Sequence, residues 1–215
     1  MQTKDRVAVL TGAGSGIGRA LANALARTGC NLALADLNSD SLAETAAQAR
    51  ALGVRVSEHP LDVSDRAAVA ALPAAVIAEH GNVEILINNA GVALGGNFDE
   101  VSTENFDWLM SINFDAVVTM CRAFLPLLKQ RPEARIVNIS SLFGLITPAG
   151  QTAYCASKFA VRGFSNALRL ELLDSNVGVT VVHPGGVATS IATSARSSEN
   201  VSEADKQKKL ERAKR

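Results

Sequence analysis

The sequence predicts an α/β fold in which a doubly wound parallel sheet lies between two layers of helices, giving three α/β/α layers in one domain. Short apolar runs alternate with longer helical segments along the chain. Runs such as 84–88 and 135–139 are apolar almost throughout, which is typical of parallel strands buried on both faces. A length of 215 residues suits one domain of this kind.

Strands and helices alternate in this prediction. The expected strands are 6–10, 31–36, 54–58, 84–88, 135–140 and 178–183, and the expected helices are 17–28, 39–52, 65–80, 103–130 and 152–175. Right-handed crossovers between successive strands would place helices on both faces of the sheet. The long fourth helix contains Pro126, where a bend is expected. No internal repeat or interdomain linker interrupts the pattern.

A glycine-rich turn follows the first expected strand. Residues 11–18 read TGAGSGIG and lead directly into an Ala/Leu-rich helix. Glycines allow a tight turn and a close approach of the backbone to a ligand. The helix N-terminus then offers free N–H groups to a pyrophosphate. With a strand before it and a helix after it, the turn indicates dinucleotide binding. The alternative is a tight strand–helix turn without a ligand.

An acidic residue ends the second expected strand. Asp36 stands 24 residues after Gly12, where a carboxylate accepts hydrogen bonds from the adenosine ribose in dinucleotide-binding folds. The same charge would repel a 2′-phosphate, and the following Leu37 and Asn38 offer no compensating cation. The sequence therefore favours NAD over NADP. Alternatively, Asp36 caps the next helix, although Asn38 and Ser39 are better placed for capping.

A tyrosine and a lysine lie one helical turn apart in the last expected helix. Tyr154 and Lys158, at positions i and i+4, share one helix face. A nearby cation favours the phenolate and lowers the tyrosine pKa from about 10, which suits general acid–base catalysis. Ser141, thirteen residues before the tyrosine, can supply a hydrogen bond to the same substrate oxygen. Taken alone, such a Tyr–Lys pair is also found on solvated helix faces.

The composition excludes several classes of protein. Lys+Arg equals Asp+Glu at 21 each, so no net field draws nucleic acid or an anionic membrane. The scattered Cys30, Cys121 and Cys155 predict free thiols in a reducing compartment, with Cys155 packing beside Tyr154. Neither a signal peptide nor a stretch long enough to span a bilayer is expected, which favours the cytoplasm. No metal site is expected.

Taken in order, these motifs resemble those of the classical short-chain dehydrogenases/reductases, a family with a Rossmann-like fold. The resemblance runs from about Val7 to about Ser190. Asp62 and Val63 resemble the pair that contacts the adenine ring, residues 88–91 the motif that ends the fourth strand, and residues 184–189 the segment that holds the nicotinamide carboxamide. The cofactor-binding residues that the resemblance implies are Gly12, Ser15, Gly16, Ile17, Gly18, Asp36, Asp62, Val63, Asn89, Ala90, Gly91, Tyr154, Lys158, Pro184, Gly185, Val187 and Thr189.

The resemblance also implies a catalytic set and a reaction, the transfer of a hydride between a nicotinamide cofactor and a ketone or secondary alcohol. The catalytic set is Asn113, Ser141, Tyr154 and Lys158. In the oxidation direction Tyr154 removes the alcohol proton while Ser141 hydrogen-bonds the substrate oxygen. Lys158 lowers the tyrosine pKa and binds the nicotinamide ribose. Asn113 helps to hold a water that links Lys158 to solvent.

Several of these residues also have a structural interpretation. Ser140 competes with Ser141, although the alternation of a strand keeps both from pointing the same way, and the family spacing favours Ser141. Asn88 and Asn89 can simply satisfy backbone groups at a strand end. Asn113 can be an ordinary polar residue of the long helix.

The substrate is predicted less sharply than the cofactor. Ser141, Phe143, Gln151 and Tyr154 are expected to contact it, and Leu94, Leu142, Ile146, Gly186 and the 191–200 loop are further candidates. Most of these are apolar, which favours a rather apolar carbonyl or alcohol. Two other hypotheses stay open: a dinucleotide-binding scaffold or sensor without turnover, and an inactive fragment of an enzyme.

Two further expectations concern surfaces and the end of the chain. Helices 103–130 and 152–175 carry more apolar surface than one face against a sheet needs, which predicts a homodimer or homotetramer. Residues 1–190 form the expected dinucleotide-binding and catalytic domain, and 191–215 are expected to be a mobile cover over the site. The charged end 203–215 resembles part of the family's substrate-loop helix, or else is a solvated tail. Because family members usually continue into a seventh strand that would cover strand 178–183, the native protein is expected to extend beyond Arg215.

Overall fold

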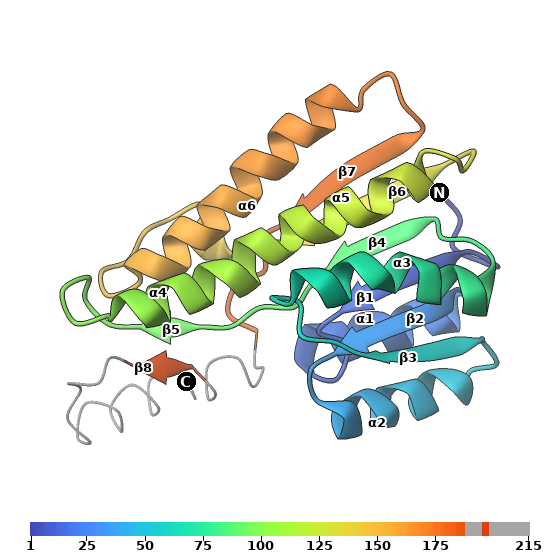
Figure 1. The fold of residues 1–215 in the computed structure, drawn as a ribbon, viewed down its shortest axis with the longest axis horizontal. Coiled ribbons are helices and arrows are strands. Elements are labelled where there is room, and N and C mark those ends of the chain that lie inside the picture. Colours follow the sequence, from blue (N-terminus) through green and yellow to red (C-terminus); the bar gives the residue numbers. More distant parts are fainter. Residues whose placement is uncertain (188–194, 198–215) are drawn as a thin grey trace.

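The computed structural model describes residues 1–187 and 195–197 and contains a six-stranded parallel sheet between two layers of helices (Figure 1). The strand order is β3-β2-β1-β4-β6-β7. The strands are β1 (Val7–Thr11), β2 (Asn31–Asp36), β3 (Val56–Pro60), β4 (Ile85–Asn88), β6 (Ala134–Ile139) and β7 (Val177–Val182). The helices are α1 (Gly16–Arg27), α2 (Ser39–Arg50), α3 (Arg66–His80), α4 (Thr103–Met110), α5 (Ala116–Leu128) and α6 (Thr152–Glu171). The predicted doubly wound α/β fold is confirmed.

The two faces of the sheet carry two separate cores. Val7 and Val9 of β1 pack with residues of α3, α5 and α6, whereas Ala8 and Leu10 pack with residues of α1 and α2. Successive side chains of a strand point to opposite faces, so an uninterrupted apolar strand contributes side chains to both cores. Fully burying an aliphatic side chain such as Leu10 contributes about 1.5–3 kcal/mol, before the entropy cost of ordering it.

The ends of the helices follow local capping chemistry. The Asn38 side chain accepts a hydrogen bond from the Ser41 N–H (2.9 Å) and caps α2, as the sequence favours over a capping role for Asp36. The Asp65 carboxylate caps α3, which ends at Gly81 in a left-handed conformation (φ 78°). Most element ends lie within two residues of the predicted ones, but α6 stops at Glu171, four residues early.

The predicted helix 103–130 is not one regular α-helix. A π-helical turn, Ser111–Asp115, separates α4 from α5 and lies well before Pro126, where the sequence predicts the bend. Such turns insert one extra residue into the helical hydrogen-bond pattern and are frequent at functional sites. Here the turn buries Asn113, which is only 1% exposed.

The prediction that no stretch is long enough to cross a membrane is wrong. Thr103–Leu128 is long and apolar enough by length and composition, with a mean hydropathy of 1.3 in its most apolar window. In the fold this segment is a partly buried core helix, because Met120, Phe124 and Leu128 pack against the sheet. Its apolar character is explained by that packing.

All three cysteines are buried and unpaired, as the sequence predicts. Burial raises the pKa of Cys30 and of Cys121 to about 12, and it also raises the pKa of Cys155. A thiol with a raised pKa is a poor nucleophile. Cys155 therefore packs beside Tyr154 rather than offering a reactive group.

The end of the chain is described only at residues 195–197. A short strand β8 (Arg196–Ser197) pairs in parallel with β5 (Leu94–Gly95), outside the main sheet. Within the described residues, β7 is an edge strand of the main sheet, where the sequence predicts that a seventh strand would pair. The expected cover formed by 191–215, and the expected domain boundary at 190, otherwise lie outside the described residues.

Two histidines share one serine hydroxyl at the β3 edge of the sheet. The Ser57 Oγ lies 2.7 Å from the His59 Nε2 and 2.9 Å from the His80 Nε2. A hydroxyl has one proton, so it donates to one imidazole and accepts from the other. Burial lowers the pKa of both histidines below the ordinary value of 6.5, Arg55 adds to the lowering at His80, and Glu79 opposes it at both.

We expect this pair to make the fold sensitive to acid. Because the folded-state pKa values of His59 and His80 are lowered, their contribution to stability is complete above pH 6.5 and is lost as the pH falls through those values. The His59→Asn/His80→Gln variant should therefore lose less free energy of unfolding than the parent between about pH 7.5 and about pH 5.5 in urea titrations. His183→Gln is the control, and an unchanged pH dependence in the double variant would contradict the expectation.

Candidate active site

A cleft of about 340 Å³ lies along the carboxyl ends of the strands. Sixteen of the seventeen residues expected to bind the cofactor line it, and the seventeenth, Thr189, lies outside the described residues. The cleft is also lined by Ser140, the alternative to Ser141, and by residues that sequence reasoning did not assign to it, namely Leu37, Leu61, Val92, Ile112 and Ile139. Parallel strands place all their carboxyl ends at one edge of a sheet, which is where doubly wound folds bind ligands.

The glycine turn between β1 and α1 has no room for larger residues. Gly12 has a φ of 63°, and a Cβ there would lie 2.8 Å from the Ala90 Cα. A Cβ on Gly18 would overlap the Gly12 carbonyl oxygen. Ser15, the N-cap of α1, is exposed and makes no side-chain capping bond. Ser15, Gly16 and Ile17 line the cleft, and the N–H groups of a helix start, which have no partner within the helix, suit a pyrophosphate.

Backbone groups hold the Asp36 carboxylate at the end of β2. The Gly14 N–H donates to Oδ2 (2.8 Å) and the Asn38 N–H donates to Oδ1 (2.9 Å). Among the described residues that line the cleft, Lys158 is the only lysine or arginine. It lies by the end of β6, and β1 and β4 separate β6 from β2 in the sheet. The Asp36 end of the cleft is thus acidic.

The two asparagines at the end of β4, Asn88 in the strand and Asn89 after it, make structural hydrogen bonds. The Asn89 amide donates to the Thr11 and Gly12 carbonyl oxygens, at 3.0 Å each, and so ties the glycine turn to β4. The Asn88 amide donates to the Asn138 Oδ1 (2.8 Å) inside the core. Both side chains thus bond to protein groups, as expected if they only satisfy polar groups at a strand end. Asn89 also lines the cleft.

Tyr154 and Lys158 face each other from successive turns of α6. The Lys158 Nζ lies 5.7 Å from the centroid of the tyrosine ring and donates to the Ile139 carbonyl oxygen (3.2 Å). Lys158 is only 4% exposed, and this burial lowers its pKa to about 8. The ammonium is therefore still mostly charged at neutral pH.

Burial raises the pKa of Tyr154 above its ordinary value of 10. The neighbouring Ser141 hydroxyl lowers this pKa, but burial is the largest effect. The expected lowering by Lys158 is therefore not found in the structure. Desolvation disfavours both the phenolate and the ammonium, so burying the pair moves both residues toward their neutral forms.

The two serines after β6 have different partners. The Ser140 Oγ donates to the Lys158 carbonyl oxygen (2.9 Å), so that hydroxyl serves the α6 backbone. The Ser141 Oγ accepts from the Phe143 N–H (3.1 Å) and lies beside the Tyr154 hydroxyl. Of the two, Ser141 is the one whose hydroxyl is next to the tyrosine.

Asn113 lies beneath the cleft rather than in its wall. Its Oδ1 accepts from the Val92 N–H (2.8 Å), and its amide donates to the Val92 carbonyl (3.0 Å) and to the Ser157 Oγ (3.2 Å). A Cβ on Gly91 would lie 3.2 Å from the Asn113 Oδ1 and 3.5 Å from the Lys158 Nζ. A side chain at position 91 would thus press against the Asn113 amide and contact the lysine ammonium.

The expected substrate residues are only partly brought together. The Phe143 ring meets the Tyr154 ring edge to face at 6.1 Å. Gln151 precedes α6 and pairs with Gly96, and neither Phe143 nor Gln151 lines the cleft. Leu94 is buried at 2% exposure against Leu109 and Ala153, so it belongs to the core rather than to an open pocket.

A contact that the sequence does not signal holds the described end of the chain. The Arg196 guanidinium stacks 3.6 Å from the centroid of the Trp108 ring and donates to the Asn105 Oδ1 (3.0 Å). Trp108 packs in the same small apolar cluster as Tyr154. This contact joins α4 to a segment 88 residues later, which no local pattern reveals.

The family model of the short chain dehydrogenases matches residues 6–200, and the chain belongs to the short-chain dehydrogenase/reductase family. It is therefore an NAD(P)-dependent oxidoreductase of that type.

Three relatives illustrate the likeness. SadH of Mycobacterium tuberculosis, an oxidoreductase by name, is 50% identical over 194 residues, which are 89% of this chain and 70% of SadH. The crystal structure of a short-chain dehydrogenase/reductase from Burkholderia phymatum in complex with NAD has a TM-score of 0.90 and 36% identity, over 99% of this chain and 80% of that one. A metagenomic short-chain oxidoreductase in complex with NADP has a TM-score of 0.81 and 34% identity, over 86% and 84% of the two chains.

Proposed function

We propose that the protein transfers a hydride between NAD(H) and a ketone or secondary alcohol. The observation that carries the proposal is the placement of Tyr154, Lys158 and Ser141 in one cleft with the glycine turn and Asp36. A proton-transfer group and a dinucleotide cradle are the two parts that such a reaction needs. A nicotinamide ring bound beside Tyr154 would supply the carbon that accepts or donates the hydride.

In this proposal the side chains of α6 and of the segment after β6 handle the proton. Because burial raises its pKa, Tyr154 is a neutral phenol at neutral pH and can donate its proton to a carbonyl oxygen in the reduction direction. In the oxidation direction Tyr154 must first lose that proton so that its phenolate can accept the proton of the alcohol, with the Lys158 ammonium 5.7 Å from the ring centroid. The Ser141 hydroxyl hydrogen-bonds the same oxygen and stabilises the charge that develops there. Asn113 holds the Val92 backbone and the hydroxyl of Ser157, the residue before Lys158, and is the candidate for a water relay.

The proposed substrate is rather apolar and small. Leu142 and Ile146, exposed at 38% and 50%, follow Ser141, and Phe143 packs on Tyr154. Such side chains favour a hydrophobic ketone or alcohol over a sugar phosphate. We place the protein in the cytoplasm, since its buried, unpaired cysteines suit a reducing compartment.

Turnover and its dependence on Tyr154 test the proposal. With a panel of ketones and secondary alcohols and NAD(H), we expect a change in the absorbance of the reduced nicotinamide. Tyr154→Phe should lower kcat by about 10²-fold or more, while the Kd for NADH stays within about twofold. Lys158→Ala should damage both kcat and NADH binding, because the lysine serves both.

The outcomes of this test separate the alternatives. NADH binding without any turnover would support a dinucleotide sensor or scaffold instead of an enzyme. Appreciable activity in Tyr154→Phe would remove the tyrosine from the acid–base role. Cys155→Ala, next to the tyrosine but outside the proton path, is the matched control and should keep its activity.

The acidic Asp36 end of the cleft predicts a preference for NAD(H). The parent kcat/KM should be higher with NADH than with NADPH, because the carboxylate repels a 2′-phosphate. The Asp36→Ser/Leu37→Arg variant should shift the ratio of the two kcat/KM values toward NADPH by about tenfold or more, since it exchanges a repelling charge for an attracting one. Leu37→Ala is the control, and a parent that works better with NADPH would contradict the expectation.

Helices α5 and α6 are proposed to form the contact between subunits of a homodimer or homotetramer. Within one chain the Phe114 ring of the π-helical turn already packs on the Phe164 ring of α6 at 6.3 Å, whereas Phe159 of α6 is still 36% exposed and available to a second subunit. Light scattering at micromolar concentration should give a mass of at least twice the chain's 22.5 kDa, and Phe159→Glu should reduce it. A parent protein that is strictly monomeric would count against this surface.

A further inference from the structure

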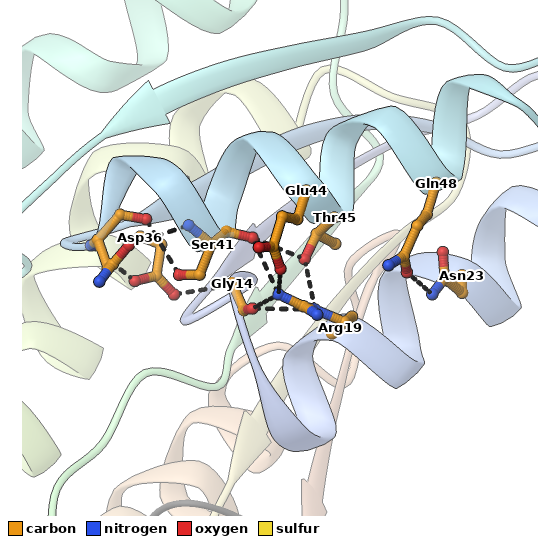
Figure 2. A network of polar contacts seen from close by, with 9 residues as sticks. Gly14, Arg19, Asn23, Asp36, Ser41, Glu44, Thr45 and Gln48 are labelled. Atoms are coloured by element: carbon orange, nitrogen blue, oxygen red, sulfur yellow. Dashed lines mark hydrogen bonds and ion pairs between the residues drawn. The ribbon is translucent and has the colours of Figure 1, made fainter.

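Arg19, in the first turns of α1, ties the glycine turn to helix α2 (Figure 2). Its Nε and Nη2 both donate to the Gly14 carbonyl oxygen, at 3.0 Å and 2.6 Å. The Nε also donates to the Thr45 Oγ1 (3.0 Å), and the Nη2 donates to the Ser41 carbonyl (3.2 Å). An ion pair with Glu44 (2.8 Å) completes the set. One guanidinium thus joins the glycine turn after β1 to the first two turns of α2.

The Gly14 peptide lies between Arg19 and Asp36. Its carbonyl accepts from the guanidinium, and its N–H donates to the Asp36 Oδ2 (2.8 Å). A Cβ on Gly14 would overlap the Ser41 Oγ and lie 3.0 Å from the same carboxylate oxygen. A movement of this turn is therefore passed directly to Asp36.

The Asp36 carboxylate has an orientation that two backbone groups fix. The Gly14 N–H holds Oδ2, and the N–H of Asn38, the N-cap of α2, holds Oδ1. A carboxylate oxygen has more than one lone pair, so each oxygen can still accept from a ribose hydroxyl. The fixed geometry of the acid depends on how the glycine turn and α2 sit together.

We propose that Arg19 is a positioning residue for the adenosine ribose of the cofactor. It holds the glycine turn against α2 so that the Asp36 carboxylate is aimed at the ribose hydroxyls. Arg19 does not line the cleft, so it acts through Gly14 and Asp36 rather than by touching the cofactor. The kinetic test of this inference rests on the proposed use of NAD. The binding test does not, because ADP-ribose binding is measured without turnover.

The chain offers a matched control on the same two helices. One turn further along α1, the Asn23 amide donates to the Gln48 Oε1 (2.8 Å) on α2, as Figure 2 shows. This bond also links α1 to α2, but it touches neither Gly14 nor Asp36. A role in general stability would be shared by Arg19 and Asn23, whereas positioning of the carboxylate belongs to Arg19 alone.

Calorimetric titration of the full chain with ADP-ribose tests the inference. Arg19→Met should raise the Kd by about tenfold, the size expected for loss of hydrogen bonds to a charged group, and Arg19→Lys should rescue part of it. Asn23→Ala should leave the Kd within about twofold even if its Tm falls. In turnover assays Arg19→Met should raise the KM for NAD and leave kcat nearly unchanged. Should Arg19→Met fail to fold, Thr45→Val removes one acceptor of the guanidinium and should raise the Kd in the same direction.

A double-mutant cycle decides whether Arg19 acts through Asp36. In an Asp36→Asn background the effect of Arg19→Met on the Kd should largely disappear, because the group that it positions is already disabled. An undiminished effect there, or equal effects of the Arg19 and Asn23 variants, would overturn the inference. If the parent binds ADP-ribose but turns over no substrate, the proposed function is wrong. The binding data then still decide whether Arg19 positions the Asp36 carboxylate.

Discussion

The chemistry available to this chain depends on the parallel pairing of β1, β4 and β6. The register sets Leu10 beside Ile87 and Asn88 beside Asn138, so the three strands end together at one edge of the sheet. These ends are followed by the glycine turn after β1, by Asn89 after β4 and by the two serines after β6. The Asn89 bonds to the first turn then fix the spacing between neighbouring strand ends. A site made of residues from distant parts of the sequence thereby becomes a consequence of backbone pairing.

Burial is the second constraint, and it acts on the charges of the site. The Lys158 Nζ donates to the Ile139 carbonyl in the interior, while the Ser140 hydroxyl donates to the lysine's own carbonyl. In such surroundings both the ammonium and the phenolate of Tyr154 are disfavoured, so their pKa values move in opposite directions. Any charge that a ligand brings next to this pair acts through a low dielectric and shifts both values strongly. The protonation state of the site is therefore coupled to what is bound.

The elements and most of the cleft could be predicted because their signals are local. Continuous apolar runs define the strands, and a glycine turn needs only its own sequence and its neighbours. The π-helical turn at Ser111–Asp115 could not be predicted, since its stability comes partly from Asn113 bonding to Val92, far away in the chain. The burial that raises the pKa of Tyr154 and the core position of Leu94 likewise depend on packing between distant segments. The Arg196–Trp108 stack has no local signal at all.

The two ends of the cleft are built by different means. At the Asp36 end, the Gly14 backbone accepts from Arg19 and donates to Asp36, and a Cβ on Gly14 would overlap the Ser41 Oγ. At the Tyr154 end, side chains such as those of Ser141, Tyr154 and Lys158 line the cleft, and side chains can be exchanged without moving the sheet. Because backbone geometry is set by strand pairing and side-chain chemistry is not, the first end suits a ligand part that never changes. The second end depends on side-chain chemistry, which substitution can change while the strand pairing stays the same.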